Sequence, residues 1–223
     1  MNRRLVVLPI AAMAVAIAFW KWNPPPPITT PAACTWRTGS GTEIHQGINF
    51  DKLAPESPVR LSVHTQEPLH LYVWSQSLED GTLLLFPSPK LQSDRKNPLP
   101  TGQSVLPGSI DGKDLAWTSR VGIVAVTTFV AFASREALPE LDALVPKVRQ
   151  WSNTVFPDHS MLVTKTTEGQ EVLGKSGSPG WAAPLLQQAA DQLRQQTEPN
   201  GPMQPLAGRP GVWVSSWKVV ERR

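Results

Sequence analysis

The chain has 223 residues, with 21 Lys and Arg against 18 Asp and Glu, and a formal net charge of +3. Arg3, Arg4 and Lys21 precede Thr35 and no acidic residue does, so the chain without them has 18 basic and 18 acidic residues. This balance lacks the positive charge typical of nucleic-acid binders, and we expect no nucleic-acid partner. The single cysteine, Cys34, excludes an intramolecular disulfide. The 23 prolines indicate short elements with much loop.

An uncharged apolar run, Leu5–Trp20, follows the basic start and predicts a membrane segment. A cleaved signal peptide and an uncleaved anchor are the two main interpretations, and a buried helix is a third. Trp20-Lys21-Trp22 makes a poor cleavage site but suits a membrane interface, which favours the anchor. Arg3 and Arg4 then place the N-terminus in the cytoplasm. We expect a single-pass protein of the bacterial inner membrane with an extracytoplasmic domain, or a secreted or periplasmic one if the signal is cleaved.

Residues 23–41 are predicted to form a proline-rich linker after this anchor and its cytoplasmic stub, residues 1–22. Pro24–Pro27 favour a semi-rigid polyproline II spacer. Cys34 follows Pro31-Ala32-Ala33, and small residues before a cysteine suit lipidation. Pro31 stands where a lipoprotein signal requires an aliphatic residue, however, and the apolar run ended 14 positions before Cys34. We therefore expect Cys34 to be a free thiol in the linker.

The globular part, residues 42–223, is predicted to be organised around a hairpin at Leu69–Pro89. Two apolar runs flank Glu79-Asp80-Gly81, and Asp-Gly between such runs is a strong hairpin signal because Gly tolerates the positive φ of tight turns. Pro58–Thr65 alternates apolar and polar residues, which predicts a half-buried strand. Thr42–Asn49 is the expected first strand.

Gly122–Ala133 is the most apolar segment outside the N-terminus. It is too short for a second transmembrane helix and rich in Val, Thr and Phe, so we expect a buried central strand. Further strands are predicted at Gly102–Leu106, Leu115–Thr118 and Gly211–Val220, the last with two tryptophans on one face. His159–Gly174 is predicted to form a second hairpin.

Helices are predicted at two places. Leu138–Trp151 has apolar residues at helical spacing but is broken by Pro139 and Pro146. Gly180–Gln196 has the clearest pattern, with an apolar residue every four positions and a possible cap at Ser178. The predicted fold is α+β, a β-rich sandwich-like domain with two or three short helices, preceded by one N-terminal transmembrane helix. The apolar stripe of the second helix is Trp181, Leu185, Ala189 and Leu193.

Gly169–Ser176 fits the pattern of a phosphate-binding P-loop, G-x-x-x-x-G-K-[ST]. A functional P-loop requires a helix to begin at Lys175-Ser176, yet Gly177, Pro179 and Gly180 follow directly. Glu171 would also place a carboxylate among the phosphates. The hairpin interpretation of this segment is therefore favoured.

No other motif predicts a catalytic or metal site. The four histidines, His45, His64, His70 and His159, have no metal-ligand spacing. Gly102–Leu106 lacks the final glycine of a hydrolase elbow, and Cys34 lies in the predicted linker. We expect no catalytic residues, no metal and no cofactor.

Nine tryptophans is a high number for this length. Exposed aromatic side chains form partner-binding patches or sugar platforms, whereas buried ones pack the core. Core packing is the simpler interpretation of this set. The candidates for a binding surface are Tyr72, Trp74, Trp117, Trp213 and Trp217.

The hairpin carries a family resemblance. Tyr72-Val73-Trp74, Glu79-Asp80-Gly81 and Leu84–Pro89 resemble the signature of an uncharacterised bacterial domain with a Tyr-Val strand, an Asp-Gly turn and a Leu-Phe-Pro core. The resemblance covers about Val59–Leu138. Such domains are accessory modules in envelope and signalling proteins, which implies no enzymatic activity. Gly102, Pro107-Gly108 and Gly122–Ser134 fit the remaining segments of the signature.

The sequence therefore favours a membrane-anchored bacterial envelope protein with a non-catalytic binding domain for a protein partner, in envelope signalling or assembly. Two alternatives remain open. One is a nucleotide-binding or hydrolytic enzyme, with Lys175 as the candidate phosphate ligand. The other is a glycan or peptidoglycan binder that uses tryptophan platforms.

Overall fold

The structure is a computed structural model that describes residues 30–39, 44–77, 81–118, 125–148, 151–154, 163–166, 184–194, 196 and 198–221. The predicted anchor Leu5–Trp20 lies outside the described residues, and so do residues 23–29, 40 and 41 of the predicted linker. Within the described part, no helix has the length and apolar character needed to cross a membrane.

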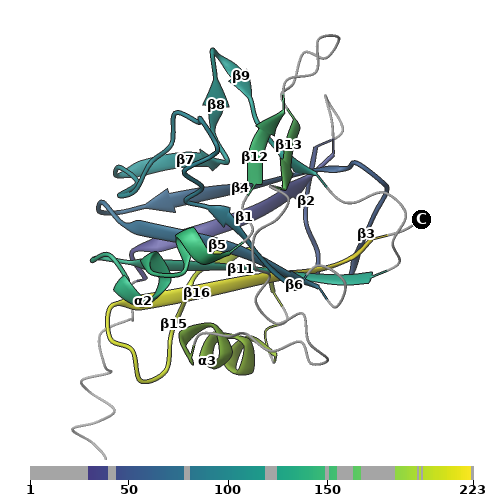
Figure 1. Cartoon of the computed structure of the whole chain (residues 1–223). Helices are drawn as coiled ribbons and strands as arrows, with labels where there is room; N and C mark the ends of the chain where they lie inside the picture. The colour runs from purple at the N-terminus through teal and green to yellow at the C-terminus, as the bar shows by residue number, and fades with distance from the viewer. Residues whose placement is uncertain are drawn as a thin grey trace, which may run out of the picture.

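Two six-stranded β-sheets make up most of the described chain (Figure 1). In the first sheet, β4 lies between β1 on one side and β10 and β7 on the other, and β1 also pairs with β2 and β14. All pairs in this sheet are antiparallel. Its strands are β1 (Ala32–Thr38), β2 (His45–Gln46), β4 (Pro58–Thr65), β7 (Gly102–Leu106), β10 (Trp117–Thr118) and β14 (Gly201–Pro202).

The second sheet has the order β15-β16-β11-β5-β6, and β3 adds to β16 in parallel. The predicted hairpin is confirmed, because β5 and β6 pair antiparallel. The predicted buried strand is also confirmed, because β11 is central and pairs with β5 and β16 along its length. The strands are β3 (Asp51–Leu53), β5 (His70–Ser77), β6 (Gly81–Phe86), β11 (Ala125–Ser134), β15 (Gln204–Pro205) and β16 (Val212–Glu221).

The second sheet is buried on both faces. Leu71 and Val73 of β5 face the first sheet in the inter-sheet core, whereas Tyr72 and Trp74 face the helices in a second, helix-side core. Successive strand residues point to opposite faces, so the two cores follow from apolar residues at every position of this strand. The described chain therefore has the layers sheet, sheet and helix, and a β-rich sandwich is confirmed. In Figure 1, α3 lies on the side of β16 away from β4 and β7.

Two short α-helices and one 3₁₀ helix are described, α2 (Pro139–Asp142), η1 (Val145–Lys147) and α3 (Pro184–Leu193). Leu185, Ala189 and Leu193 of α3 are buried, as its apolar spacing predicts. Trp181 and Ser178 lie outside the described residues. The prolines of Leu138–Trp151 do divide this segment into short pieces, and both begin with proline at the first or second helical position.

Several expectations about element positions are wrong. Ala32–Thr38 was predicted to be linker but forms β1, which pairs with β4 over its whole length and buries every second side chain. Trp151 was predicted to end a helix but begins β12 (Trp151–Thr154), which pairs with β13 (Val163–Thr166). β13 lies within the predicted second hairpin, His159–Gly174, but its partner is the preceding strand β12, and residues 167–174 of that hairpin lie outside the described residues. A further two-stranded pair, β8 (Ser109–Ile110) with β9 (Lys113–Asp114), was not predicted.

Candidate interaction surface

The five aromatic residues predicted as a binding surface are all buried, so this prediction is wrong as stated. Tyr72, Trp74 and Trp217 are 0% exposed, Trp117 is 1% exposed and Trp213 is 8% exposed. The strand pattern assigns each residue to a face correctly, with Trp213 and Trp217 together in the inter-sheet core. Both faces of the second sheet are covered, however, and Trp117 of the first sheet lies in the inter-sheet core, so there is no aromatic platform at these positions.

Tyr72 has a structural role in the helix-side core. Its hydroxyl group donates to Asp142 Oδ1 over 3.0 Å and accepts the backbone N–H of Leu138 over 2.9 Å. Burial raises the pKa of Tyr72 to about 12, and the hydrogen bond to the Asp142 carboxylate adds to the rise because it favours the protonated phenol. The residue thereby ties β5 to both ends of α2.

Cys34 is free, as expected, but lies in β1 and not in a linker. Its side chain is 2% exposed among the residues of the inter-sheet core. Burial raises the pKa of the thiol to about 11, against a smaller lowering by a hydrogen bond with Ser215. A protonated, enclosed thiol is a poor nucleophile.

Exposed large apolar residues concentrate in one short stretch instead. Ile44, Ile48 and Phe50 are 44%, 66% and 58% exposed, and they lie between β1 and β3. Ile48 and Phe50 belong to a tight turn, in which the N–H of Asp51 donates to the carbonyl oxygen of Ile48 over 3.0 Å. We call residues Ile48–Asp51 the apolar turn. Val126 and Val105 are the other exposed large apolar residues in the described chain.

The apolar turn is strained at its aromatic residue. Phe50 has φ of 62°, in the left-handed region that bulky residues rarely adopt. Its N–H donates to the carbonyl oxygen of Lys218 over 2.7 Å, which fixes this conformation. Backbone strain of this kind costs about 1–3 kcal/mol and persists only where the surroundings determine the conformation. In this fixed conformation the Phe50 ring remains exposed to solvent.

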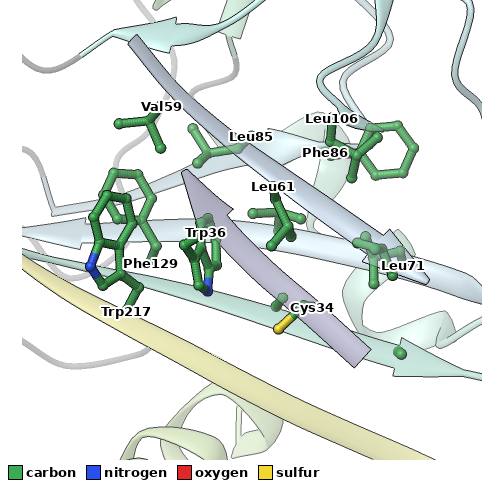
Figure 2. Close-up of a cluster of buried hydrophobic side chains, with 14 of the residues drawn as sticks. Cys34, Trp36, Val59, Leu61, Leu71, Leu85, Phe86, Leu106, Phe129 and Trp217 are labelled. Carbon is green, nitrogen blue, oxygen red and sulfur yellow. The ribbon is translucent and has the colours of Figure 1, made fainter. Parts of the chain in front are cut away.

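The inter-sheet core holds the base of the apolar turn. A Cβ on Gly47 would lie 2.4 Å from Cε2 of Trp217, so the bare Gly47 backbone rests against the indole ring. The ring's Nε1 donates to the carbonyl oxygen of Ile48 over 2.8 Å. Trp217 itself packs with Trp36 and Phe129, with ring centroids 5.8 Å and 5.6 Å away. Figure 2 shows these three rings together at one end of the core.

Two asparagine side chains complete the attachment. Asn200 accepts the N–H of Trp36 over 2.7 Å and donates to the carbonyl oxygen of Gly47 over 2.7 Å. Asn49 accepts the N–H of Lys218 over 3.1 Å and donates to the carbonyl oxygen of Gln196 over 3.3 Å. These amides replace missing strand partners at the edges of β1 and β16. The apolar turn is thus a fixed part of the sandwich.

The charges around the apolar turn are few. Asp51 pairs with His45, with 3.4 Å between Oδ2 and Nε2, and its other oxygen accepts the N–H of Lys52 over 3.0 Å. No group of three or more His, Cys, Asp or Glu side chains that could hold a metal exists among the described residues. The exposed side chains of the turn thus offer contact with an apolar surface.

Sequence reasoning missed this turn, because Thr42–Asn49 was predicted to be one strand, whereas the strand there is limited to His45–Gln46 (β2). Gly47 and Asn49 are residue types that favour turns, and they alternate with the apolar Ile48 and Phe50. This alternation was the signal in the sequence for a turn that carries apolar side chains. The candidates for other chemistry, Gly169–Ser176 with Lys175 and also His159, lie outside the described residues.

Comparisons with protein-family models, with curated proteins and with solved structures gave no match. The resemblance of Val59–Leu138 to an uncharacterised bacterial domain therefore stays a prediction. The functional argument rests on the geometry of the chain itself.

Proposed function

We propose that this protein is a non-catalytic binding module that docks onto a protein partner through Ile48 and Phe50 of the apolar turn. One observation carries the proposal. Two large apolar side chains, 66% and 58% exposed, are held in solvent by a turn whose backbone is bonded to the core. A loop that exposed these side chains by chance would not require the strained φ of Phe50.

The energetics support a docking role. Burying an Ile or Phe side chain against a partner contributes about 1.5–3 kcal/mol each. The turn is already fixed by the bonds of Ile48, Asn49 and Phe50 to β16 and its neighbours, so little ordering entropy opposes the contact. A few rigid, central side chains of this kind carry most of the binding energy in typical interfaces.

The cellular setting in this proposal is the bacterial envelope. Leu5–Trp20 would anchor the chain in the inner membrane, and residues 23–31 would separate the sandwich from the bilayer. Nine residues of polyproline II span roughly 28 Å at about 3.1 Å per residue. The apolar turn follows the C-terminal end of β1, whereas the tether enters at its N-terminal end. This separation favours a protein partner over the anchoring membrane.

The alternatives have less support. The tryptophans named for a glycan platform, Trp74, Trp117, Trp213 and Trp217, are buried. An enzyme through Lys175 has no supporting geometry among the described residues, which do not include that segment. Neither alternative explains the exposed Ile48 and Phe50.

The test is affinity capture from membranes with the full-length chain. Wild type is compared with the double variant Ile48→Ser/Phe50→Ser and with Val126→Ser, a control at an exposed valine on β11. We expect a partner that is recovered with wild type and Val126→Ser and lost with the double variant. Equal recovery with all three chains would contradict the proposal, and so would the absence of any partner with wild type.

A further inference from the structure

A second feature lies at the other end of the sandwich. β6 and β7 are joined by residues 87–101, a long connection without strands or helices of its own. Loops of this length in compact domains commonly have a functional role. In Figure 2, Phe86 at the start of this loop and Trp217 beneath the apolar turn lie at opposite ends of the core. The loop is thus independent of the surface proposed above.

This loop encloses an open pocket of about 210 Å³. Its apolar part includes Phe86 and Leu91, which are 2% and 7% exposed and fixed in the core. Two cations, Arg95 and Lys96, complete it, and no carboxylate is among the lining residues. The full lining is Phe86, Pro87, Ser88, Pro89, Leu91, Ser93, Arg95, Lys96 and Asn97.

Hydrogen bonds hold the loop in one shape. The side-chain amide of Asn97 accepts the N–H of Leu71 over 2.9 Å and donates to its carbonyl oxygen over 2.7 Å, as a neighbouring strand would. Leu99 forms a reciprocal backbone bridge with Leu69, with bonds of 3.1 Å and 2.7 Å. The pocket is therefore preformed.

Arg95 is seated by its neighbours. The backbone N–H of Arg95 donates to Ser93 Oγ over 3.2 Å. A Cβ on Gly108 would lie 2.7 Å from Cγ of Arg95. The absence of a side chain at Gly108, which has φ of 103°, therefore leaves the space that the arginine stem fills. Asp94 Oδ1 is occupied by the N–H of Ser109 at 2.6 Å.

The charge of this arginine is incompletely compensated. Its Nε is buried without a hydrogen-bond partner and forms only a long ion pair, over 3.7 Å, with Oδ2 of Asp94. Within the described chain, the Arg95 guanidinium makes no hydrogen bond, although its side chain is only 35% exposed. A partly desolvated guanidinium gains most from a carboxylate, which it can bind through two parallel N–H groups.

We propose that this pocket binds an apolar carboxylate, with the apolar body against Phe86, Pro87 and Leu91 and the carboxylate on Arg95 beside Lys96. The volume suits a ligand the size of one amino-acid residue, since drug-sized sites are about 300–1,000 Å³. The same chemistry is offered by a free organic acid and by the C-terminal residue of a polypeptide.

The test uses amide chemical shifts of the isotope-labelled full-length protein, titrated with N-acetyl-leucine and with neutral N-acetyl-leucinamide. We expect saturable shifts at Leu91, Ser93 and Arg95 with the acid, and binding of the amide that is weaker by about tenfold or more. Arg95→Gln should weaken binding of the acid similarly, and Lys96→Gln by less. Lys113→Gln, an exposed control on β9, should leave it unchanged.

Two outcomes overturn the proposal. One is no saturable shift with the acid, and the other is equal binding of the acid and the amide. If Arg95→Gln lowers stability, Lys96→Gln and the comparison of acid with amide still decide the question in the wild-type fold. A peptide ending in leucine identifies the source, because tighter binding than the free acid indicates a chain terminus and no binding indicates a small acid.

Discussion

The indole Nε1–H of Trp217 donates to the carbonyl oxygen of Ile48 over 2.8 Å, and this bond links the aromatic core directly to the most exposed isoleucine in the described chain. The same ring touches the Gly47 backbone. A core tryptophan thus positions the residues that we propose to contact a partner. Changes within the core should therefore affect binding through the shape of the turn.

Gly47→Ala should destabilise the protein, because the new Cβ would lie 2.4–2.5 Å from the Trp217 ring. Overpacking of this kind costs about 1–3 kcal/mol. Chemical denaturation of wild type, both single variants and Gly47→Ala/Trp217→Phe measures the effect. Phenylalanine lacks the crowded indole atoms, so Gly47→Ala should cost less in the Trp217→Phe background. Additive costs would show that the two residues do not press on each other.

Tyr72 should lose its phenol proton at a higher pH than a free tyrosine does. It is the one tyrosine in the sequence, so tyrosinate absorbance during a base titration reports on it alone. The midpoint should be near pH 12, compared with about 10 for a free tyrosine. Asp142→Asn should lower the midpoint, because it removes the negatively charged carboxylate that accepts a hydrogen bond from the phenol.

The raised pKa of Tyr72 has a consequence for stability. The unfolded chain releases the phenol proton near pH 10, whereas the folded chain retains it to about pH 12. The free energy of unfolding therefore falls as pH rises through this window. Tyr72→Phe should remove this part of the fall. A midpoint near 10 in the native protein would contradict the burial of this side chain.

Cys34 should resist modification while the protein is folded. Its thiol is buried and its pKa is raised to about 11, so little thiolate exists near neutral pH. As the one cysteine in the chain, it gives a clean readout of maleimide labelling. We expect slow labelling in native buffer and rapid labelling in denaturant. Rapid labelling of the native protein would contradict the burial of Cys34 and would favour its predicted place in an exposed linker.

The strand pattern predicted much of the fold because period-two burial is local information. The alternation of Val59, Leu61 and Val63 identified β4, and the Asp80-Gly81 turn identified the pairing of β5 with β6. What the pattern could not show is which faces are covered. Tyr72 and Trp74 point away from the first sheet, and only the packing of α2 and α3 makes that face a core.

The missed features depend on contacts distant in sequence. β1 was taken for linker because Ala32, Ala33 and Cys34 are small residues after prolines, and their pairing with β4 is not encoded locally. The apolar turn depends on bonds to Lys218 and Trp217, about 170 positions later in the chain. A positive φ at phenylalanine contradicts its preference for extended backbone, so local sequence could not predict this conformation.

The central claim is that Phe50 contacts a protein partner, and photo-crosslinking in cells tests it most directly. A photoreactive phenylalanine analogue replaces Phe50 in the full-length chain, with Val126 as the matched exposed position. We predict one discrete adduct from position 50 that is weakened by Ile48→Ser, and none of that size from position 126. No adduct at position 50, or the same adduct from both positions, would contradict the account.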